Sequence, residues 1–363
     1  MFVYYDESIL SYVACIRNSF GLSSSYTPNT KFKDYLNKKN PQKIFLILID
    51  GMGANLIERK LPKDSFLRKN LFKKVTTVFP TTTTAALTSI SNGKSPNENA
   101  WLGWMEYLEE IDDIIIPFLG ESYYEDIKHD EDICYKLRPF KTTVEELNEI
   151  GIKAINLYPD FIEGGCKDFT EFKNRLIDLS YSDNKYVFAY WDKYDTIMHL
   201  EGPNSIKADS YLKMINDGLE EVSNNISNDT MLVIVADHGQ SEIDLPYYIE
   251  GSKFEKYMYR KPIIESRSPG FYVKEEYRKE FEAEFKKDFE NDFILLDKQD
   301  IIDTKLFGYH DNHPKFESML PDYLAIGKSK KVIRWCPLEV ELQGQHAGIL
   351  DDELYIPLIT YKK

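Results

Sequence analysis

The stretch Lys43-Ile-Phe-Leu-Ile-Leu-Ile-Asp-Gly-Met-Gly53 decides the fold. Its apolar residues follow one another without alternation, as is typical of a strand buried on both faces of a parallel sheet. Asp50 comes directly after this strand, and a glycine-rich turn leads into a helix. The same order returns where the apolar stretch Met231–Ala236 is followed by Asp237-His238-Gly239. The two stretches predict a parallel sheet with polar side chains at the carboxyl ends of its strands.

Strand and helix patterns alternate along most of the chain. This order predicts an α/β fold with a doubly wound, mostly parallel sheet and helices on both faces. We expect strands at residues 43–49, 75–79, 153–158, 186–191, 231–236 and 355–360, and helices at residues 6–20, 85–91, 143–150, 169–179 and 205–226.

Two stretches depart from this alternation. Residues 105–141 are acidic and aromatic with weak periodicity, which indicates an excursion over the face that holds the site. Residues 255–320 combine short strand patterns with a charged helix and predict a small inserted α+β cap. We therefore divide the chain into a core at 1–254, the cap at 255–320 and the rest of the core at 321–363. In this division the strand at Tyr323 to Ile326 returns to the core.

Composition limits the classes of function. Hydrophobic residues make up 42% of the chain, enough for a large core, and the formal net charge is −15. A nucleic-acid polymer needs a positive face, so we expect none as a partner. A small phosphorylated substrate is compatible with an acidic surface because bound metal cations dominate the local field. The oligomeric state is open.

Location is also an expectation from composition. The four cysteines lie far apart without a C-x-x-C pair, which favours reduced, mostly buried thiols. The first residues do not resemble a signal peptide, because Asp6 and Glu7 stand where positive charge is typical. The longest apolar run, Ile44 to Ile49, is too short to cross a membrane. We expect a cytoplasmic protein without a membrane partner.

Several acidic residues and histidines have the spacing of metal ligands. Asp195 and His199 are four residues apart, which places both side chains on one face of a helical turn. Asp50 and Asp237 follow strands, although a helix N-cap is the alternative for Asp50 and an ion pair the alternative for Asp195 with His199. Imidazole and carboxylate groups suit Zn²⁺, with Mn²⁺ or Mg²⁺ also possible. The candidate ligands are Asp50, Asp195, His199, Asp237, His238 and His346.

A run of four threonines, Thr81 to Thr84, precedes a predicted helix. The free N–H groups and the dipole at a helix N-terminus favour a phosphate there. A threonine activated by metal coordination is a possible nucleophile, and a turn with an N-cap is the alternative. His310 and His313 are rival ligands, which we assign to the cap or to the substrate side.

Taken in order, these motifs resemble the alkaline phosphatase superfamily and are most similar to its type I phosphodiesterase/nucleotide pyrophosphatase branch. The resemblance covers residues 43–359 and rests on their joint order. The matching stretches are Leu46-Ile-Leu-Ile-Asp-Gly-Met-Gly53, Phe79-Pro-Thr-Thr-Thr83 with Gly93 ten residues further on, Tyr190 to Pro203, Val233-Ile-Val-Ala-Asp-His-Gly239 and His346-Ala-Gly348.

The resemblance implies a two-metal hydrolase that cleaves phosphodiester or pyrophosphate bonds of a small, nucleotide-like substrate. One zinc ion would be held by Asp195, His199 and His346. The other would be held by Asp50, Asp237, His238 and Thr83, which the spacing to Gly93 selects as the nucleophile. Attack by Thr83 would give a phosphothreonine intermediate, which water then hydrolyses.

The chain also departs from the pattern that the resemblance leads us to expect. Ala86 stands where we expect an asparagine that binds a phosphate oxygen, and Asn99-Ala100 where we expect His-Gly. Preference for diesters or monoesters is therefore open, as is substrate identity. A metal-dependent phosphomonoesterase or phosphomutase-like enzyme is the alternative, and a non-catalytic protein that binds a phosphorylated ligand is a further one. Trp101, Trp104 and Tyr107 could stack on a base, although core packing is the alternative for at least two.

Overall fold

The computed structural model describes residues 3–363 and has a six-stranded sheet at its centre. In spatial order its strands are β2 (Leu71–Thr76), β17 (Tyr355–Lys362), β8 (Thr230–Val235), β1 (Lys43–Ile49), β7 (Tyr186–Trp191) and β6 (Ala154–Leu157). The last four run parallel, whereas β17 runs antiparallel to β2 and β8. The predicted α/β fold with a mostly parallel sheet is confirmed.

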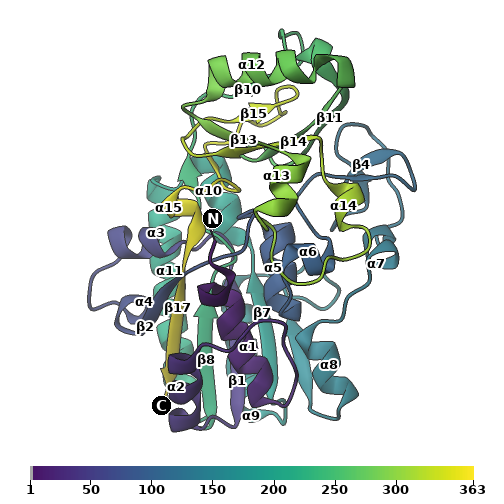
Figure 1. Ribbon diagram of the computed structural model, residues 1–363. Helices are drawn as coiled ribbons and strands as arrows, with labels where there is room; N and C mark the ends of the chain where they lie inside the picture. Colours follow the sequence, from purple (N-terminus) through teal and green to yellow (C-terminus); the bar gives the residue numbers. More distant parts are fainter. Residues whose placement is uncertain (1–2) are drawn as a thin grey trace.

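Two groups of helices flank this sheet (Figure 1). The first contains α1 (Ile9–Ser19), α2 (Thr30–Lys39), α5 (Thr83–Asn92), α6 (Pro96–Asn99) and α8 (Thr143–Glu149). The second contains α3 (Ala54–Lys60), α4 (Phe66–Lys69), α9 (Phe169–Tyr181), α10 (Lys193–Glu201) and α11 (Ile206–Asn225).

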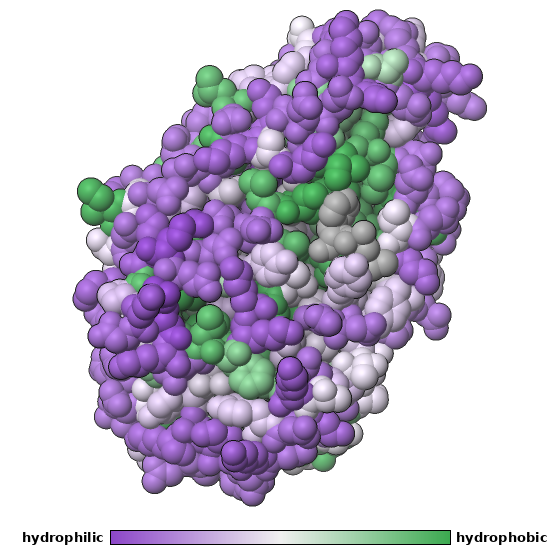
Figure 2. All heavy atoms as spheres, turned by 60° about the vertical axis from the view of Figure 1, so that its left-hand side comes forward, coloured by the Kyte–Doolittle hydropathy of each residue, from purple (hydrophilic) through white to green (hydrophobic). Residues whose placement is uncertain are grey.

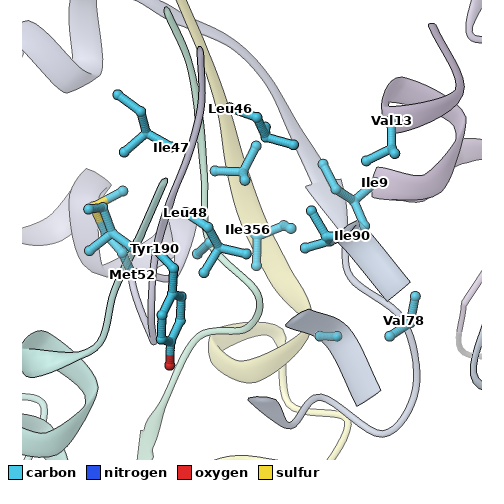
Figure 3. Packing of buried hydrophobic residues seen from close by; sticks show 14 of the residues in the cluster. Ile9, Val13, Leu46, Ile47, Leu48, Met52, Val78, Ile90, Tyr190 and Ile356 are labelled. Atoms are coloured by element: carbon cyan, nitrogen blue, oxygen red, sulfur yellow. The ribbon is translucent and has the colours of Figure 1, made fainter. Parts of the chain in front are cut away.

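The apolar residues of β1 are buried on both faces of the sheet, as expected for a central parallel strand. Successive side chains point to opposite faces. Figure 3 shows Leu46 on the side of Val13 from α1 and Ile90 from α5, and Ile47 on the opposite side. The order of the strands therefore places β1 and its carboxyl end in the middle of the molecule.

A second sheet lies beyond the carboxyl ends of the parallel strands, in the upper part of Figure 1. Its strands, in spatial order, are β11 (Met258–Ile264), β12 (Pro269–Val273), β14 (Tyr323–Gly327) and β13 (Phe293–Asp297). The helix α12 (Arg278–Phe289) contributes Phe281, Phe285 and Phe289 to an apolar cluster that includes Phe271 and Phe293 from this sheet. This part of the molecule therefore has its own small core.

The segment at residues 105–141 forms another small sheet. It contains β3 (Glu106–Leu108), β4 (Asp113–Ile116) and β5 (Glu121–Ser122), followed by α7 (Ile133–Leu137). It packs against β11, because Met105 pairs with Ile264 and the Tyr124 hydroxyl donates to the Pro262 carbonyl at 2.9 Å. The remaining elements are short: β9 (Ser241–Glu242), β10 (Tyr247–Tyr248), α13 (Lys298–Asp303), α14 (Phe316–Met319), β15 (Ile333–Arg334), β16 (Gly344–Gln345) and α15 (Asp351–Leu354).

The expectation that the strand at Tyr323 to Ile326 returns to the core is wrong, because β14 pairs with β12 and β13. Its apolar residues fit either sheet, and its position is set by partners that are distant in the sequence. The domain boundaries placed at residues 255 and 320 stay predictions.

The strand expected at residues 75–79 begins earlier in the structure, at Leu71. Lys73 and Lys74 lie within this edge strand, where lysines are common although they are unusual in a central one. The helix α2 was not predicted. It begins after Asn29, whose side chain accepts a hydrogen bond from the Phe32 backbone N–H at 3.1 Å.

The surface is largely polar on the face in Figure 2, and hydrophobic residues gather there in a band between the upper and lower parts of the molecule. Within residues 3–363, no helix has both the length and the apolar character needed to span a membrane. The four cysteines are free thiols, and Cys15, Cys134 and Cys166 are buried, in agreement with the prediction.

Candidate active site

Three neighbouring strands place the predicted ligands at one edge of the central sheet. Asp50 follows β1, Asp237 follows β8 after one residue, and α10, which contains Asp195, follows β7. Since β1 lies between β7 and β8, these carboxylates converge in front of it. The side chain of His346 reaches the same place from the segment between β16 and β17.

The first group of donors contains Asp50, Asp237 and His238. The His238 Nε2 atom lies 3.4 Å from Asp50 Oδ1 and 3.5 Å from Asp237 Oδ2. Both of these carboxylate oxygens are buried, and neither has a hydrogen-bond partner within residues 3–363. Buried carboxylate oxygens without partners are costly, and a divalent cation would neutralise them. The donor set therefore fits a metal ion.

The second group of donors contains Asp195, His238 and His346, whose ligand atoms lie within 4.8 Å of one another. His199 is adjacent, with its Nε2 atom 3.1 Å from Asp195 Oδ2 and its ring centroid 5.0 Å from that of His346. His238 thus lies between the two groups, and its ring is stacked on His346 at 3.8 Å. All six predicted ligands converge, although the residues nearest to Asp195 and His346 include His238 as well as His199.

A backbone carbonyl fixes the orientation of each of the three imidazole rings. The Nδ1 atoms of His199, His238 and His346 lie 2.8–3.0 Å from the carbonyl oxygens of Gly344, Gly239 and Thr81. When Nδ1 carries the proton and donates it to the carbonyl, Nε2 is free to bind a metal ion.

Burial and neighbouring charges shift the pKa values of four groups in the site. Burial and the neighbouring carboxylates of Asp237 and Asp195 raise the pKa of Asp50 well above its usual value. Burial likewise raises the pKa of Asp237, and it lowers the pKa of His346 well below its usual value with help from His238. Burial also opposes ionisation of Asp195, but His199 and the other imidazoles outweigh it and lower the pKa of that carboxyl. His346 is therefore neutral at pH 7, as a metal ligand must be.

Thr83 is the member of the threonine run that points into this cluster. Its Oγ1 atom lies 3.2 Å from His238 Nε2 and 3.5 Å from Asp50 Oδ2. The other three threonines are fully buried, whereas Thr83 is partly exposed. Thr83 is also the first residue of α5, so the free N–H groups of that helix adjoin its hydroxyl. The Thr83 hydroxyl therefore lies at a helix end whose free N–H groups can bind a phosphate.

Several residues near the predicted ligands were not found from the sequence. The Tyr190 hydroxyl donates to Asp50 Oδ2, and Figure 3 shows this hydroxyl at the edge of the apolar cluster. The Gln240 side-chain amide donates to Asp195 Oδ1 at 2.7 Å. Glu265, directly after β11, accepts a hydrogen bond from the Thr82 hydroxyl. Its pKa is raised to about 7 by burial, although Thr82 and the nearby imidazoles of His199 and His238 oppose this shift.

The rival histidines lie elsewhere. The His310 ring packs edge-on against Tyr26 at 4.6 Å, and the His313 backbone N–H donates to the Asn97 carbonyl at 2.7 Å. Neither residue belongs to the two donor groups. Trp101 is completely buried in a small apolar cluster, so it packs in the core and cannot stack on a base. Ala86 is fully buried in α5.

The model of one protein family, type I phosphodiesterase/nucleotide pyrophosphatase, matches residues 124–331 of the chain. The chain therefore belongs to this family of enzymes, which hydrolyse phosphoric esters. No curated protein sequence matches the chain.

Solved structures of related proteins share the fold. Human ectonucleotide pyrophosphatase/phosphodiesterase 5 is 15% identical, with a TM-score of 0.70 and coverage of 88% of each chain. The murine protein of the same name is 16% identical, with a TM-score of 0.69 and coverage of 89% of this chain and 88% of the murine one. An inactive variant of the murine protein in complex with AMP is similar as well, with a TM-score of 0.68 and 16% identity over 88% of each chain.

Proposed function

We propose that this enzyme is a two-metal hydrolase that cleaves phosphodiester or pyrophosphate bonds of a small, nucleotide-like substrate through a phosphothreonine at Thr83. The position of the Thr83 hydroxyl supports this proposal most directly, because it lies beside both Asp50 and His238 at the N-terminus of α5. The AMP bound to the murine relative is consistent with a nucleotide-like substrate.

Asp50, Asp237 and His238 would hold one ion, and Asp195, His199 and His346 the other. Three imidazoles and three carboxylates favour Zn²⁺, with Mn²⁺ or Mg²⁺ as alternatives. When bound, the ions would lower the pKa of the Thr83 hydroxyl and of water, and would stabilise negative charge on the phosphoryl oxygens.

The residues of the chain account for the remaining steps. The Thr83 oxygen attacks phosphorus as the bond to the leaving oxygen breaks, and the phosphoryl group is transferred to Thr83. The helix end at α5 provides N–H donors for the oxygens of that group. Water then attacks the phosphothreonine from the side that the leaving group has vacated, which restores the Thr83 hydroxyl and releases the phosphorylated product.

The test compares bis-p-nitrophenyl phosphate with p-nitrophenyl phosphate on chelator-treated protein, with and without added Zn²⁺ or Mn²⁺. We expect added metal to restore cleavage, with preference for the diester. Preference for the monoester would instead assign the enzyme to the phosphomonoesterase or phosphomutase-like alternative. Acid quenching followed by mass spectrometry should detect phosphate on Thr83, and phosphate on any other residue would contradict the proposed nucleophile.

The cytoplasmic location and the absence of a membrane partner belong to the same proposal and rest on the sequence alone. Fractionation of the cells that produce the protein tests them directly.

A further inference from the structure

Arg334 is a buried arginine with one unused edge. It ends β15 and is 4% exposed, and its Nη1 atom donates to Glu341 Oε2 at 2.7 Å. Its Nε and Nη2 atoms have no hydrogen-bond partner within residues 3–363. A guanidinium group keeps its charge at any physiological pH, so the unpaired donors cannot be removed by loss of a proton.

The unused edge is the one that binds carboxylates and phosphates in a bidentate manner. Nε and Nη2 present two parallel N–H groups that match the two oxygens of a carboxylate or phosphate. Arg267 shows this geometry in the same chain, because its Nε and Nη2 atoms donate to Oε1 and Oε2 of Glu353. Arg334 has the same two donors without a partner in the part of the chain that the structure describes.

A second arginine, Arg138, also has Nε and Nη2 atoms without a partner among the described residues, but its surroundings differ. Its partner Glu106 is only 2% exposed, and its guanidinium group lies 5.1 Å from the centroid of the buried Trp101 ring. The partner of Arg334, Glu341, is 42% exposed. The ion pair of Arg334 therefore has one member at the surface, whereas both members of the Arg138 pair are enclosed.

Two short series of contacts connect Arg334 to the active site. On one side, the Ile333 N–H donates to the Ser266 carbonyl at 3.0 Å, and the neighbouring Glu265 accepts from Thr82, next to Thr83. Burial raises the pKa of Tyr123 to about 12 with a contribution from Glu265, and the charge of Arg334 opposes this shift. These contacts place Arg334 next to the segment that borders the nucleophile.

On the other side, the segment from Glu341 to Gly344 leads back to a proposed metal ligand. Glu341 binds Arg334, and the Gln343 N–H donates to the His199 carbonyl at 2.7 Å. The carbonyl of Gly344 then contacts His199 Nδ1 at 2.8 Å. Arg334 thus lies between the two segments that adjoin Thr83 and His199.

We propose that the Nε and Nη2 edge of Arg334 binds a second anionic group of the substrate, a phosphate carried by the leaving group, while the first phosphoryl group is attacked by Thr83. The inference rests on the proposed function and adds to it a residue that determines specificity. Since the chain has a net charge of −15 and Glu265 and Glu341 are nearby, a second phosphate requires a positive partner there. Arg334 would favour pyrophosphate-linked substrates over diesters with neutral leaving groups.

The first experiment measures a ratio of rates. Wild type and Arg334→Gln are assayed on a dinucleoside pyrophosphate and on bis-p-nitrophenyl phosphate, whose leaving group has no second anion. We expect the ratio of kcat/KM, pyrophosphate over diester, to fall about 10- to 100-fold in Arg334→Gln, as is typical for loss of a charged hydrogen bond. This ratio does not depend on the fraction of protein that is folded. An unchanged ratio would overturn the proposal.

Two further variants sharpen the comparison. Arg278→Gln makes the same chemical change at a surface pair with Asp322 and should leave the ratio unchanged. Arg334→Lys keeps the charge but loses the two parallel donors, so the ratio should fall partway. A full wild-type ratio in Arg334→Lys would contradict a bidentate contact.

The second experiment does not depend on catalysis. Inorganic pyrophosphate is titrated calorimetrically into metal-free wild type, Arg334→Gln and Arg278→Gln. Binding that is lost only in Arg334→Gln supports the subsite. Equal binding by wild type and Arg334→Gln, or no binding by either, overturns it. If metal-loaded wild type cleaves neither substrate, the proposed function fails, and the titration still decides the role of Arg334.

Discussion

The hydroxyl oxygen of Thr83 lies 3.2 Å from Nε2 of His238, although 155 positions separate the two residues in the chain. The threonine begins α5 and the histidine follows β8, so the fold alone brings them together. The Thr83 hydroxyl lies beside an imidazole and the Asp50 carboxylate, as the proposed activation requires, whereas the threonines on either side of it are fully buried.

Thr83→Ala should lower kcat for the diester by at least about 10³-fold, because it removes the proposed nucleophile. Metal content should remain nearly intact, because Asp50, Asp237 and His238 are unchanged. The measurement combines steady-state kinetics with metal analysis of the purified variant. Thr84→Val is the matched control, since the Thr84 hydroxyl is buried without a partner among residues 3–363 and should be dispensable. Activity that survives in Thr83→Ala would show that another group attacks phosphorus.

Tyr190→Phe should weaken metal binding about 10- to 100-fold, because the Tyr190 hydroxyl orients the Asp50 carboxylate. Competition with a chromophoric chelator measures the change, and a high metal concentration should restore much of the activity. Tyr186→Phe alters a buried tyrosine of the same strand and serves as the control. Equal metal affinity in Tyr190→Phe and wild type would show that the hydroxyl has no effect on the ligand.

Metal binding should stabilise the protein more at high pH than at low pH. The pKa values of Asp50 and Asp237 are raised in the metal-free fold, so stability is highest when these groups are protonated and falls as the pH rises. Bound cations remove the repulsion between the ionised carboxylates of Asp50 and Asp237. The cations also bind best when these ligands are deprotonated. The difference in Tm between metal-loaded and chelator-treated protein should therefore widen from pH 5.5 to pH 8. In Asp237→Asn the widening should largely disappear, and a constant difference in wild type would exclude this mechanism.

Glu265→Gln should stabilise the metal-free protein at alkaline pH. Burial raises the pKa of Glu265 from 4.5 to about 7, so its ionisation destabilises the fold progressively between these two pH values. The glutamine cannot ionise but can still accept from Thr82, and the gain should approach about 3 kcal/mol at pH 8. Urea unfolding of the chelator-treated proteins at pH 5 and pH 8 measures it. Glu163→Gln, at an exposed position, should show no pH-dependent gain, and the same result for Glu265→Gln would refute the raised pKa.

The central elements were predictable because their signals are local. Uninterrupted apolar runs identify β1 and β8, and a buried parallel strand of this kind has few alternative structures. The metal-ligand candidates were found for the same reason, since aspartates that follow such strands must converge at one edge of the sheet. The i, i+4 spacing identified Asp195 and His199.

The remaining features depend on contacts between distant residues. In the sequence, Tyr190 looks like one more apolar residue of β7. Its hydroxyl gains a role only because Asp50 follows the adjacent strand β1 and accepts its hydrogen bond. Glu265 and Arg334 lie in segments without a recognisable motif, and their burial comes from packing that no window of sequence contains. The strand β14 has the pattern of a core strand but pairs in the smaller sheet, because several sheets accept the same apolar sequence.

The strand β17 lies between β2 and β8, although it is the last strand in chain order. Until residues 355–362 have left the ribosome, the central sheet has a gap one strand wide, and β2 and β8 each expose an unpaired edge. His346 is also synthesised late, so the proposed metal centre is incomplete during the same interval. A nascent or prematurely terminated chain would thus be inactive and prone to aggregate through its open edges. Residues 346–362 therefore complete both the central sheet and the proposed metal centre after the strands on either side of β17 have been synthesised.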